Sequence, residues 1–429
     1  MIYNRINDKG LNDSNLNLYK IKVLRYKSDY NDNLKKNNNQ VKSKEESKIF
    51  EKTNKNNYMQ IIKESSIICC TLNKSGDDYI QNYSNDFDYL IVDEAAQALE
   101  ISVLIPLLLN IKRVIMVGDH FQLPSVVFSE YSKLSKYNIS LFERLINSNI
   151  NYFKLEIQYR MSEKISEFIS DTFYNSKLIT DKDLIKKYNE CVLYKVFKKQ
   201  CSLCFFNITT SKEEIDINSK SFFNADEFEF CAYFVKSITK QILDKININK
   251  NKMKNLINYD ISSKLENYNI AVICAYKAQI NEIKKRIFSE NQYSDNSCKI
   301  KVDTIDSFQG AEEDIVIIST VRGNYDQFNN LKIKSENINQ IDEDDNSYSN
   351  NLVSDIKDEN YIGFLKDYKR LNVAISRARY FCFVIGNELI LQTDEKWKKL
   401  IDYCKKNKTL FDVKNMENKS KAINNIYIK

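Results

Sequence analysis

The sequence has 429 residues, of which 43% are hydrophobic, and such values are typical of a chain that folds into two globular domains. The net charge of +6 permits a polyanionic partner without requiring one. The longest strongly apolar run, ISVLIPLLL at 101–109, is too short to span a bilayer, which needs about 20 residues. The ten cysteines lack the spacing of a small secreted domain, and the start MIYNRINDKG lacks the apolar core of a signal peptide. We therefore expect reduced thiols, no membrane association, and a location in the nucleus or cytoplasm.

Short apolar runs that are typical of buried strands alternate along the chain with amphipathic patterns that are typical of helices. The strand-like runs are residues 66–72, 89–93, 113–119, 269–276, 314–320 and 379–386. The helical patterns cover residues 140–148, 162–173 and 277–288. This alternation predicts the α/β class with parallel sheets. Its two series predict two domains, at 1–150 and 151–412, followed by a tail at 413–429.

Three polar segments interrupt this alternation. Residues 28–60 and 238–268 are rich in Asn and Lys, and residues 326–360 contain an acidic run around Asp342–Asp345. Such compositions predict solvated loops or disordered excursions, because they offer too little apolar surface to bury. We interpret all three segments as insertions and assign them no function.

The stretch YLIVDEAAQALE at 89–100 ends an apolar run with two adjacent acids, Asp93 and Glu94. Asp119 closes the next run, in MVGDHFQLP. Because ligands of an open parallel sheet bind at the carboxyl ends of its strands, we expect all three acids at one edge of the first sheet. An Asp in this position holds Mg²⁺ in P-loop nucleotidases, and a neighbouring acid positions the attacking water. Strand-end acids are common without such a role, so the pattern alone does not decide the function.

Further segments follow these acids in a fixed order. They are GDHFQLP (118–124), QYRMS (158–162), VDTIDSFQGAEEDIVIISTVR (302–322) and RLNVAISRAR (370–379). Together with VDEA, they resemble motifs II to VI of superfamily 1 helicases, in the branch of the up-frameshift helicases of nonsense-mediated decay and of senataxin. The resemblance extends from about residue 60 to residue 410. It implies two RecA-like P-loop NTPase domains with parallel sheets.

The resemblance implies an ATP-dependent helicase, that is, a nucleic-acid-stimulated ATPase that moves 5′ to 3′ along single strands with ATP and Mg²⁺ as cofactors. Asp93 would bind Mg²⁺, and Glu94 would orient or deprotonate the attacking water. Gln122 would sense the γ-phosphate and link hydrolysis to domain movement. These residue types fit phosphoryl transfer, which needs positioning and charge neutralisation more than covalent help.

The second domain would contribute its own groups to the same nucleotide. Tyr159 would stack on the base, Arg160 would reach the γ-phosphate, and Arg377 would supply a second guanidinium. Gly310 and Glu312 would lie near the ribose and the phosphates. The planar, permanently charged guanidinium suits a triphosphate, and arginines from a second domain would make hydrolysis depend on domain closure.

Hydroxyl-bearing residues of motif V, and of the segment IICCTLNKSGD (67–77) that resembles motif Ic of the same branch, are candidates for contacts with a nucleic-acid backbone. They would position the backbone without reading sequence. These candidates are Thr71, Ser75, Thr304 and Ser307, and Pro124 is a candidate for contact with a base. The implied partners are single-stranded RNA or DNA, and RNA-decay or transcription-termination factors. The choice between RNA and DNA stays open, because it depends on a few contacts to the 2′-hydroxyl. We expect a monomer.

Two features with metal-like residues have simpler interpretations. CSLC at 201–204 has the spacing of half a zinc site, but no second pair stands at the required distance, and CSLCFFNI is typical of a buried strand. His120, the one histidine, occupies a position that varies within the family. We expect neither to bind a metal.

One element of the family pattern is absent from the 429 residues. No G-x-x-x-x-G-K-[ST] loop, which cradles the β- and γ-phosphates, occurs in the sequence, and Gly10 is the only glycine before Gly76. We therefore expect the first domain to be N-terminally incomplete, lacking a central strand, while the second is whole. Two function classes stay open. One is a helicase of which this chain is a fragment or truncated gene model, and the other is a non-catalytic remnant that binds nucleic acid or a protein partner.

Overall fold

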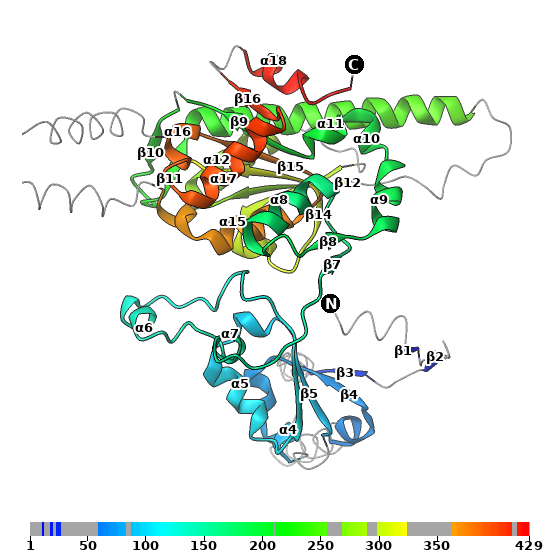
Figure 1. Cartoon of the computed structure of the whole chain (residues 1–429), viewed down its shortest axis with the longest axis vertical. Coiled ribbons are helices and arrows are strands. Elements are labelled where there is room, and N and C mark those ends of the chain that lie inside the picture. The colour runs from blue at the N-terminus through cyan, green and yellow to red at the C-terminus, as the bar shows by residue number, and fades with distance from the viewer. Residues whose placement is uncertain are drawn as a thin grey trace, which may run out of the picture. The chain divides into compact units, whose positions relative to one another are not determined.

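The computed structural model describes residues 11–12, 18–19, 23–26, 59–82, 87–209, 211–254, 268–289, 298–323, 362–413 and 418–428. The chain divides into two compact units, Met1–Tyr152 and Phe153–Lys429, which we call unit 1 and unit 2 (Figure 1). Of the three expected insertions, residues 28–58 and 326–360 lie outside the described residues.

Unit 1 contains two pairs of parallel strands. Strand β3 (Val23–Arg25) pairs with β4 (Ile67–Cys69), and β5 (Tyr89–Val92) pairs with β6 (Arg113–Met116). The last three of these strands fall on the runs predicted at 66–72, 89–93 and 113–119. The other elements of unit 1 are the antiparallel strands β1 (Leu11–Asn12) and β2 (Leu18–Tyr19), a helix at 59–64, the 3-10 turns η1 (Asn73–Gly76) and η2 (Ala95–Gln97), and the helices α4 (Asp78–Gln81), α5 (Glu100–Leu107), α6 (Glu130–Leu134) and α7 (Leu141–Asn147).

Unit 2 is built on a six-stranded sheet in the order β13-β12-β14-β15-β9-β16, in which every neighbouring pair is parallel. The strands are β9 (Leu203–Asn207), β12 (Tyr268–Cys274), β13 (Cys298–Thr304), β14 (Glu313–Ser319), β15 (Ala378–Gly386) and β16 (Leu410–Asp412). Two short strand pairs lie outside this sheet. They are β7 (Ile157–Gln158) with β8 (Ile179–Thr180), and β10 (Glu213–Ile215) with β11 (Phe222–Asn224). The predicted α/β class with parallel sheets is confirmed.

Helices cover both faces of the unit 2 sheet, which explains why its strands are apolar nearly throughout. Figure 1 shows α11 on one face and α8 and α15 on the other. Phe206 of β9 and Phe383 of β15 both contact the ring of Phe234 on α11. The helices and 3-10 turns of unit 2 are α8 (Glu163–Phe173), α9 (Lys182–Asn189), α10 (Leu193–Val196), η3 (Lys199–Ser202), α11 (Ala225–Lys254), α12 (Lys277–Phe288), η6 (Asp306–Phe308), η7 (Gly363–Lys366), α15 (Tyr368–Ser376), α16 (Glu388–Leu391), α17 (Glu395–Lys406) and α18 (Lys419–Asn424).

The structure corrects the interpretation of residues 238–268 as a loop-like insertion. Residues 238–254 continue helix α11, and Ile238 and Ile242 are fully buried in the core of unit 2. The Asn and Lys content that suggested a loop hides an apolar face at helical spacing, which the sheet covers. Residues 255–267 lie outside the described residues.

The C-terminal segment 413–429, expected as a tail, is part of the unit 2 core where it is described. Ile423 and Tyr427 are buried, and the Tyr427 ring lies 5.3 Å from that of Phe197. The Tyr427 hydroxyl forms a 2.9 Å hydrogen bond with Ser237 on α11. Apolar residues in this segment therefore pack on the domain rather than ending in solvent.

A strained turn follows strand β14 at the carboxyl edge of the unit 2 sheet. Val321 has a φ of 72°, which costs a β-branched residue roughly 1–3 kcal/mol. Two side chains at the start of α11 hold it there: the Val321 N–H donates to Glu227 Oε2 at 2.8 Å, and Asn224 Nδ2 donates to the Val321 carbonyl at 2.9 Å. Ser319 Oγ also donates to Glu227 Oε2, at 2.7 Å. The fully buried carboxyl group thus fixes the conformation of the turn.

Glu227 predicts a pH dependence of stability for this unit. Burial raises the pKa of Glu227 from 4.5 to about 7, although hydrogen bonds from Ser319, Thr320 and Val321 oppose the shift. Because the folded state binds this proton more tightly, its stabilising contribution is present below about pH 4.5 and is lost as the pH rises through about 7. The difference corresponds to at most about 3 kcal/mol.

The isosteric change Glu227→Gln should remove this contribution. We expect the unfolding free energy of the unaltered chain to fall between about pH 5 and pH 8 more steeply than that of the Glu227→Gln variant. Urea unfolding at several pH values measures both slopes, and other titrating groups cancel in the comparison. Equal slopes in the two proteins would show that Glu227 does not retain its proton in the folded state.

Candidate active site

In unit 1 the loops that follow β5 and β6 are hydrogen-bonded to each other. The Val117 N–H donates to the Val92 carbonyl at 2.8 Å, and the Ala95 N–H donates to the Val117 carbonyl at 2.8 Å. At Gly118 a Cβ atom would lie 2.8 Å from the Ala96 nitrogen, so this close approach requires glycine. The acids that follow the two strands therefore stand at one edge, as the sequence predicts.

Asp93 and Glu94 are both exposed at this edge. Glu94 has a φ of 53°, the left-handed region that non-glycine residues rarely adopt, and such strain concentrates at functional sites. Asp93 Oδ1 accepts the Glu94 N–H at 3.1 Å, and Gln97 Nε2 donates to Glu94 Oε2 at 2.7 Å. Each of the two adjacent carboxylates is therefore held by a different hydrogen bond.

A hydrogen bond to Asp119 holds Gln122 at the same edge. Its Nε2 atom donates to Asp119 Oδ2 at 2.9 Å, and the other oxygen, Oδ1, accepts the N–H of Phe121 at 3.0 Å. Asp119 thus organises the turn that carries Gln122. The sequence identified Asp119 as a strand-end acid without this role.

In unit 2, Gln158 shapes the segment that carries Arg160. Its Oε1 atom accepts the N–H groups of Arg160 at 2.9 Å and Met161 at 2.7 Å. Its Nε2 atom donates to the Met161 carbonyl and to Thr180 Oγ1. The Tyr188 hydroxyl donates to the Arg160 carbonyl at 2.6 Å. Gln158 and Tyr188 were not among the predicted site residues. The contacts Tyr188–Arg160 and Gln158–Thr180 join residues more than 20 positions apart, and only the presence of Gln158 in the QYRMS motif hinted at its role.

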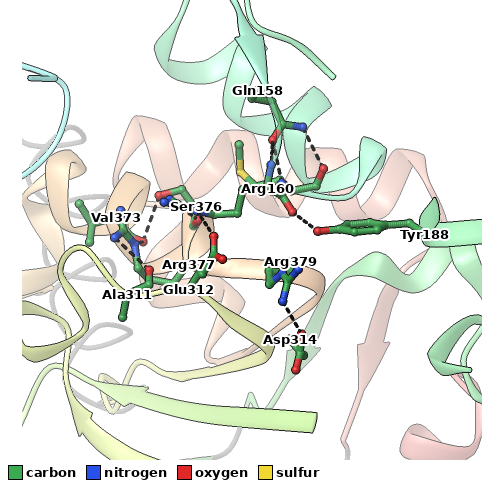
Figure 2. A network of polar contacts seen from close by, with 11 residues as sticks. Gln158, Arg160, Tyr188, Ala311, Glu312, Asp314, Val373, Ser376, Arg377 and Arg379 are labelled. Carbon is green, nitrogen blue, oxygen red and sulfur yellow. Dashed lines mark hydrogen bonds and ion pairs between the residues drawn. The ribbon is translucent and has the colours of Figure 1, made fainter. Parts of the chain in front are cut away.

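Arg160 and Glu312, which are 152 residues apart, form an ion pair of 3.2 Å between Nε and Oε2 (Figure 2). Arg160 Nη1 also donates to the Ser376 carbonyl at 3.3 Å, at the end of α15. The side chains of Arg160 and Glu312 are 34% and 45% exposed, so solvent and ligands can reach both. The structure therefore brings together three of the motifs that the sequence singled out.

Arg377 belongs to the same network but is buried, with 2% exposure. Its Nε atom donates to the Val373 carbonyl and its Nη1 atom to the Ala311 carbonyl, both at 3.2 Å (Figure 2). Two of its N–H groups thus donate hydrogen bonds to main-chain carbonyl oxygens. In this conformation Arg377 fastens the segment before Glu312 to helix α15, whereas Arg160 is the accessible guanidinium.

The remaining candidates of unit 2 surround this network. Arg379 forms a 3.3 Å ion pair with Asp314 and ties β15 to β14. Tyr159 is 66% exposed, as a ring that stacks on a base requires. Gly310 is exposed with a φ of +71°, a conformation that favours glycine.

The candidates for nucleic-acid contact differ in accessibility. Thr71 and Ser307 are exposed, and Thr304 and Pro124 are half-buried. Ser307 Oγ donates to the Thr304 carbonyl at 2.8 Å. Ser75 is 5% exposed, and its hydroxyl donates to the Leu72 carbonyl, so in this conformation it supports the turn η1.

The described residues contain neither a cluster of metal-ligating side chains nor a membrane-spanning helix. No group of three or more His, Cys, Asp or Glu side chains in that part of the chain is placed to hold a metal ion. Within the same residues, no helix is sufficiently long and apolar to cross a bilayer. Cys201 and Cys204 are buried, and β9 is buried throughout, which confirms the interpretation of CSLCFFNI as an interior strand.

The fold is that of the P-loop NTPase class with RecA-like domains. Residues 137–389 match a family model described as an AAA domain, and residues 5–130 match a second model with the same description. The chain belongs to this family, and within it to the up-frameshift and senataxin branch of superfamily 1 helicases.

Several curated helicases are similar to the chain. It is 32% identical to helicase sen1 of Schizosaccharomyces pombe over 80% of this chain and 17% of that protein. It is 32% identical to an uncharacterised ATP-dependent helicase of Methanocaldococcus jannaschii, over 81% of this chain and 42% of that protein. It is 31% identical to regulator of nonsense transcripts 1 of Dictyostelium discoideum, over 82% of this chain and 22% of that protein. The chain thus spans less than half the length of each of these relatives.

Proposed function

We propose that the protein containing this chain is an ATP-dependent helicase that hydrolyses ATP when single-stranded nucleic acid is bound and moves 5′ to 3′ along it. The observation that supports this most is the joint retention of two acids after β5 and of the Arg160–Glu312 pair in unit 2. A chain without a nucleotide to hydrolyse has no physical need for both sets. The names of the similar proteins, which include ATP-dependent helicases, agree with the proposal.

The residues of unit 1 fit a magnesium ion that is bound together with a nucleotide. Magnesium prefers hard oxygen ligands, and it is bound by one or two carboxylates plus phosphates rather than by a cage of protein groups. Asp93, an exposed carboxylate at a strand end, would hold it. When bound, the ion neutralises charge on the phosphates.

The chain's own groups would then perform the remaining work. Glu94 would accept a proton from the attacking water and orient it towards the γ-phosphate. Arg160 would neutralise the negative charge that develops on the transferred phosphoryl group, for which a planar fork of N–H donors is suited. Gln122 would sense the γ-phosphate, and Tyr159 would stack on the base.

Unit 2 also supplies a second arginine, Arg377. We propose that before the nucleotide binds, Arg377 acts on the site only by positioning its main chain. Arg377 holds the carbonyl of Ala311 next to Glu312, and so keeps the segment from Gly310 to Glu312 in place beside Arg160. We propose that Arg377 reaches the phosphates only after its main-chain hydrogen bonds rearrange on nucleotide binding.

Steady-state ATP hydrolysis with and without single-stranded RNA tests the proposal, in the natural protein that contains this chain. We expect turnover that rises when the RNA is added, and no stimulation would contradict the proposal. Strand displacement on duplexes with a 5′ or a 3′ overhang tests the direction. Activity only with the 3′ overhang would contradict 5′ to 3′ movement.

One specific observation favours a second candidate function. The 429 residues contain no G-x-x-x-x-G-K-[ST] loop, so by themselves they lack the amides and lysine that cradle the phosphates. We therefore expect the 429-residue chain alone to bind single strands with little or no ATP turnover, as a binding module would. Turnover by this chain comparable to that of the natural protein would contradict this expectation.

A further inference from the structure

An exposed aromatic ring stands on an anchored turn at the carboxyl edge of the unit 2 sheet. Phe364 is 58% exposed, while Ile362 and Leu365 on either side of it are buried. The Leu365 carbonyl accepts a 2.8 Å hydrogen bond from Nε1 of the buried Trp397, which fixes the turn η7 on helix α17. Single exposed apolar side chains are common, so exposure alone does not indicate a function.

Two further residues, Tyr276 and Arg370, contact the Phe364 ring. The buried Tyr276 ring contacts it edge-on, with centroids 5.9 Å apart and an interplanar angle of 64°. The Arg370 guanidinium lies 5.4 Å from its centroid, as in a cation–π contact. Gly363 has a φ of +51°, and a Cβ there would lie 3.0 Å from the Tyr276 hydroxyl. The turn therefore depends on glycine and presents the next residue outwards.

Exposed lysines and a serine hydroxyl stand on the turns near this ring, together with the acids Asp306 and Asp367 that pair with Arg370. Arg370 also lies 4.0 Å from Asp306 on η6, so Phe364 is close to the turn that carries the exposed Ser307. Lys366, on the same turn as Phe364, and Lys277, at the start of α12, are exposed. An aromatic platform beside cations and hydroxyls is the combination that binds single strands without reading sequence.

We propose that Phe364 is a base-stacking platform for single-stranded nucleic acid at the carboxyl edge of the unit 2 sheet, with Arg370 holding the ring in place. This inference rests on the proposed function, because it names the surface on which the strand would lie. A base stacks on the open face of the ring, and the flanking cations contact the phosphates. The contact is insensitive to sequence because every base has a π-face.

The test separates stacking from phosphate contact with two oligonucleotides of equal length. One is fluorescein-labelled oligo(dT), and the other is an abasic strand with the same phosphates and no bases. For the full 429-residue chain, fluorescence anisotropy gives the Kd of each. We expect Phe364→Ala to weaken oligo(dT) binding about 5- to 100-fold. The Kd for the abasic strand should stay unchanged, which also shows that the variant is folded.

A matched control and a second variant complete the design. Phe288 is 50% exposed but ends α12, which runs from the carboxyl end of β12 back to the amino end of β13. Phe288→Ala should change neither Kd. Phe364→Trp should retain oligo(dT) binding. The chain's one natural tryptophan, Trp397, is buried, so the fluorescence of the new, exposed indole at position 364 should be quenched by oligo(dT) but not by the abasic strand.

The outcomes distinguish this inference from the function on which it rests. If the unaltered chain binds oligo(dT) and Phe364→Ala binds it equally well, the stacking platform is refuted and the proposed function stands. An equal loss on both oligonucleotides would also refute it, because the ring would then support only the fold or the phosphate contacts. If the unaltered chain binds neither oligonucleotide, the platform fails together with the binding-module function expected of these 429 residues, whereas the helicase function is refuted only by the ATP hydrolysis and strand-displacement tests on the natural protein.

Discussion

Arg160→Ala should lower ATP hydrolysis by the natural protein that contains this chain about 10³-fold or more, with ATP binding retained. An arginine that neutralises the transferring phosphoryl group contributes about 10³- to 10⁵-fold to kcat. The change should affect stability little, because the Arg160–Glu312 pair is partly exposed and such pairs contribute about 1 kcal/mol or less. Steady-state kcat, ATP affinity and the melting temperature together separate a catalytic loss from a loss of fold.

Two other variants sharpen this measurement. Arg160→Lys keeps the charge but loses the planar fork of donors, so we expect most of the activity to remain lost. Arg286 is an exposed arginine of the same unit that pairs with Glu229 at 2.7 Å, away from the Arg160 network. Arg286→Ala should leave kcat unchanged. Full activity of Arg160→Ala would remove the accessible guanidinium from the mechanism and leave Arg377 as the candidate.

Glu94→Gln should lower hydrolysis by the same protein at least about 100-fold while ATP still binds. A positioned general base contributes about 10²- to 10⁴-fold, and the amide cannot accept the proton. The change preserves size, and Gln97 can still donate to the remaining carbonyl oxygen, so the left-handed turn at Glu94 should persist. Filter binding or fluorescent-nucleotide titration measures ATP affinity, and a phosphate-release assay measures turnover.

Glu100→Gln is the matched control for this second change. Glu100 is an acid of the same unit, at the start of α5, and it receives two hydrogen bonds from Arg144. We expect its substitution to leave turnover unchanged. If Glu94→Gln hydrolyses ATP as fast as the unaltered protein, another group must activate the water, and Asp93 and Gln122 are the remaining candidates at this edge.

The strands and helices were predictable wherever local pattern and packing agree. The apolar runs at 269–276, 314–320 and 379–386 are β12, β14 and β15, and they were recognisable because strands buried on both faces are apolar throughout. Strand β13 was missed, because its sequence CKIKVDT alternates charged and apolar residues at the edge of the sheet. The later part of α11 was missed because its Asn and Lys residues conceal the buried Ile238 and Ile242.

The candidate site was likewise predictable only in part. Its motifs could be found in the sequence because each one combines specific residue types at fixed spacing, as in VDEA and QYRMS. The accessibility of each side chain could not be found there. In the sequence Arg160 and Arg377 are both simply arginines of a motif. In the structure Arg377 is buried and donates to main-chain carbonyls, whereas Arg160 is partly exposed beside Glu312.

The fold class and the order of the motifs could be read from the sequence, because periodicity and spacing are local properties of the chain, and the family followed from the resemblance of those motifs. Which groups meet became visible only in the folded protein. The Arg160–Glu312 pair, the hold of Glu227 on the strained Val321, and the support of Phe364 by Tyr276 all join residues far apart in sequence. Such contacts depend on the order of strands in the sheet and on side-chain packing, which no single segment of the chain specifies.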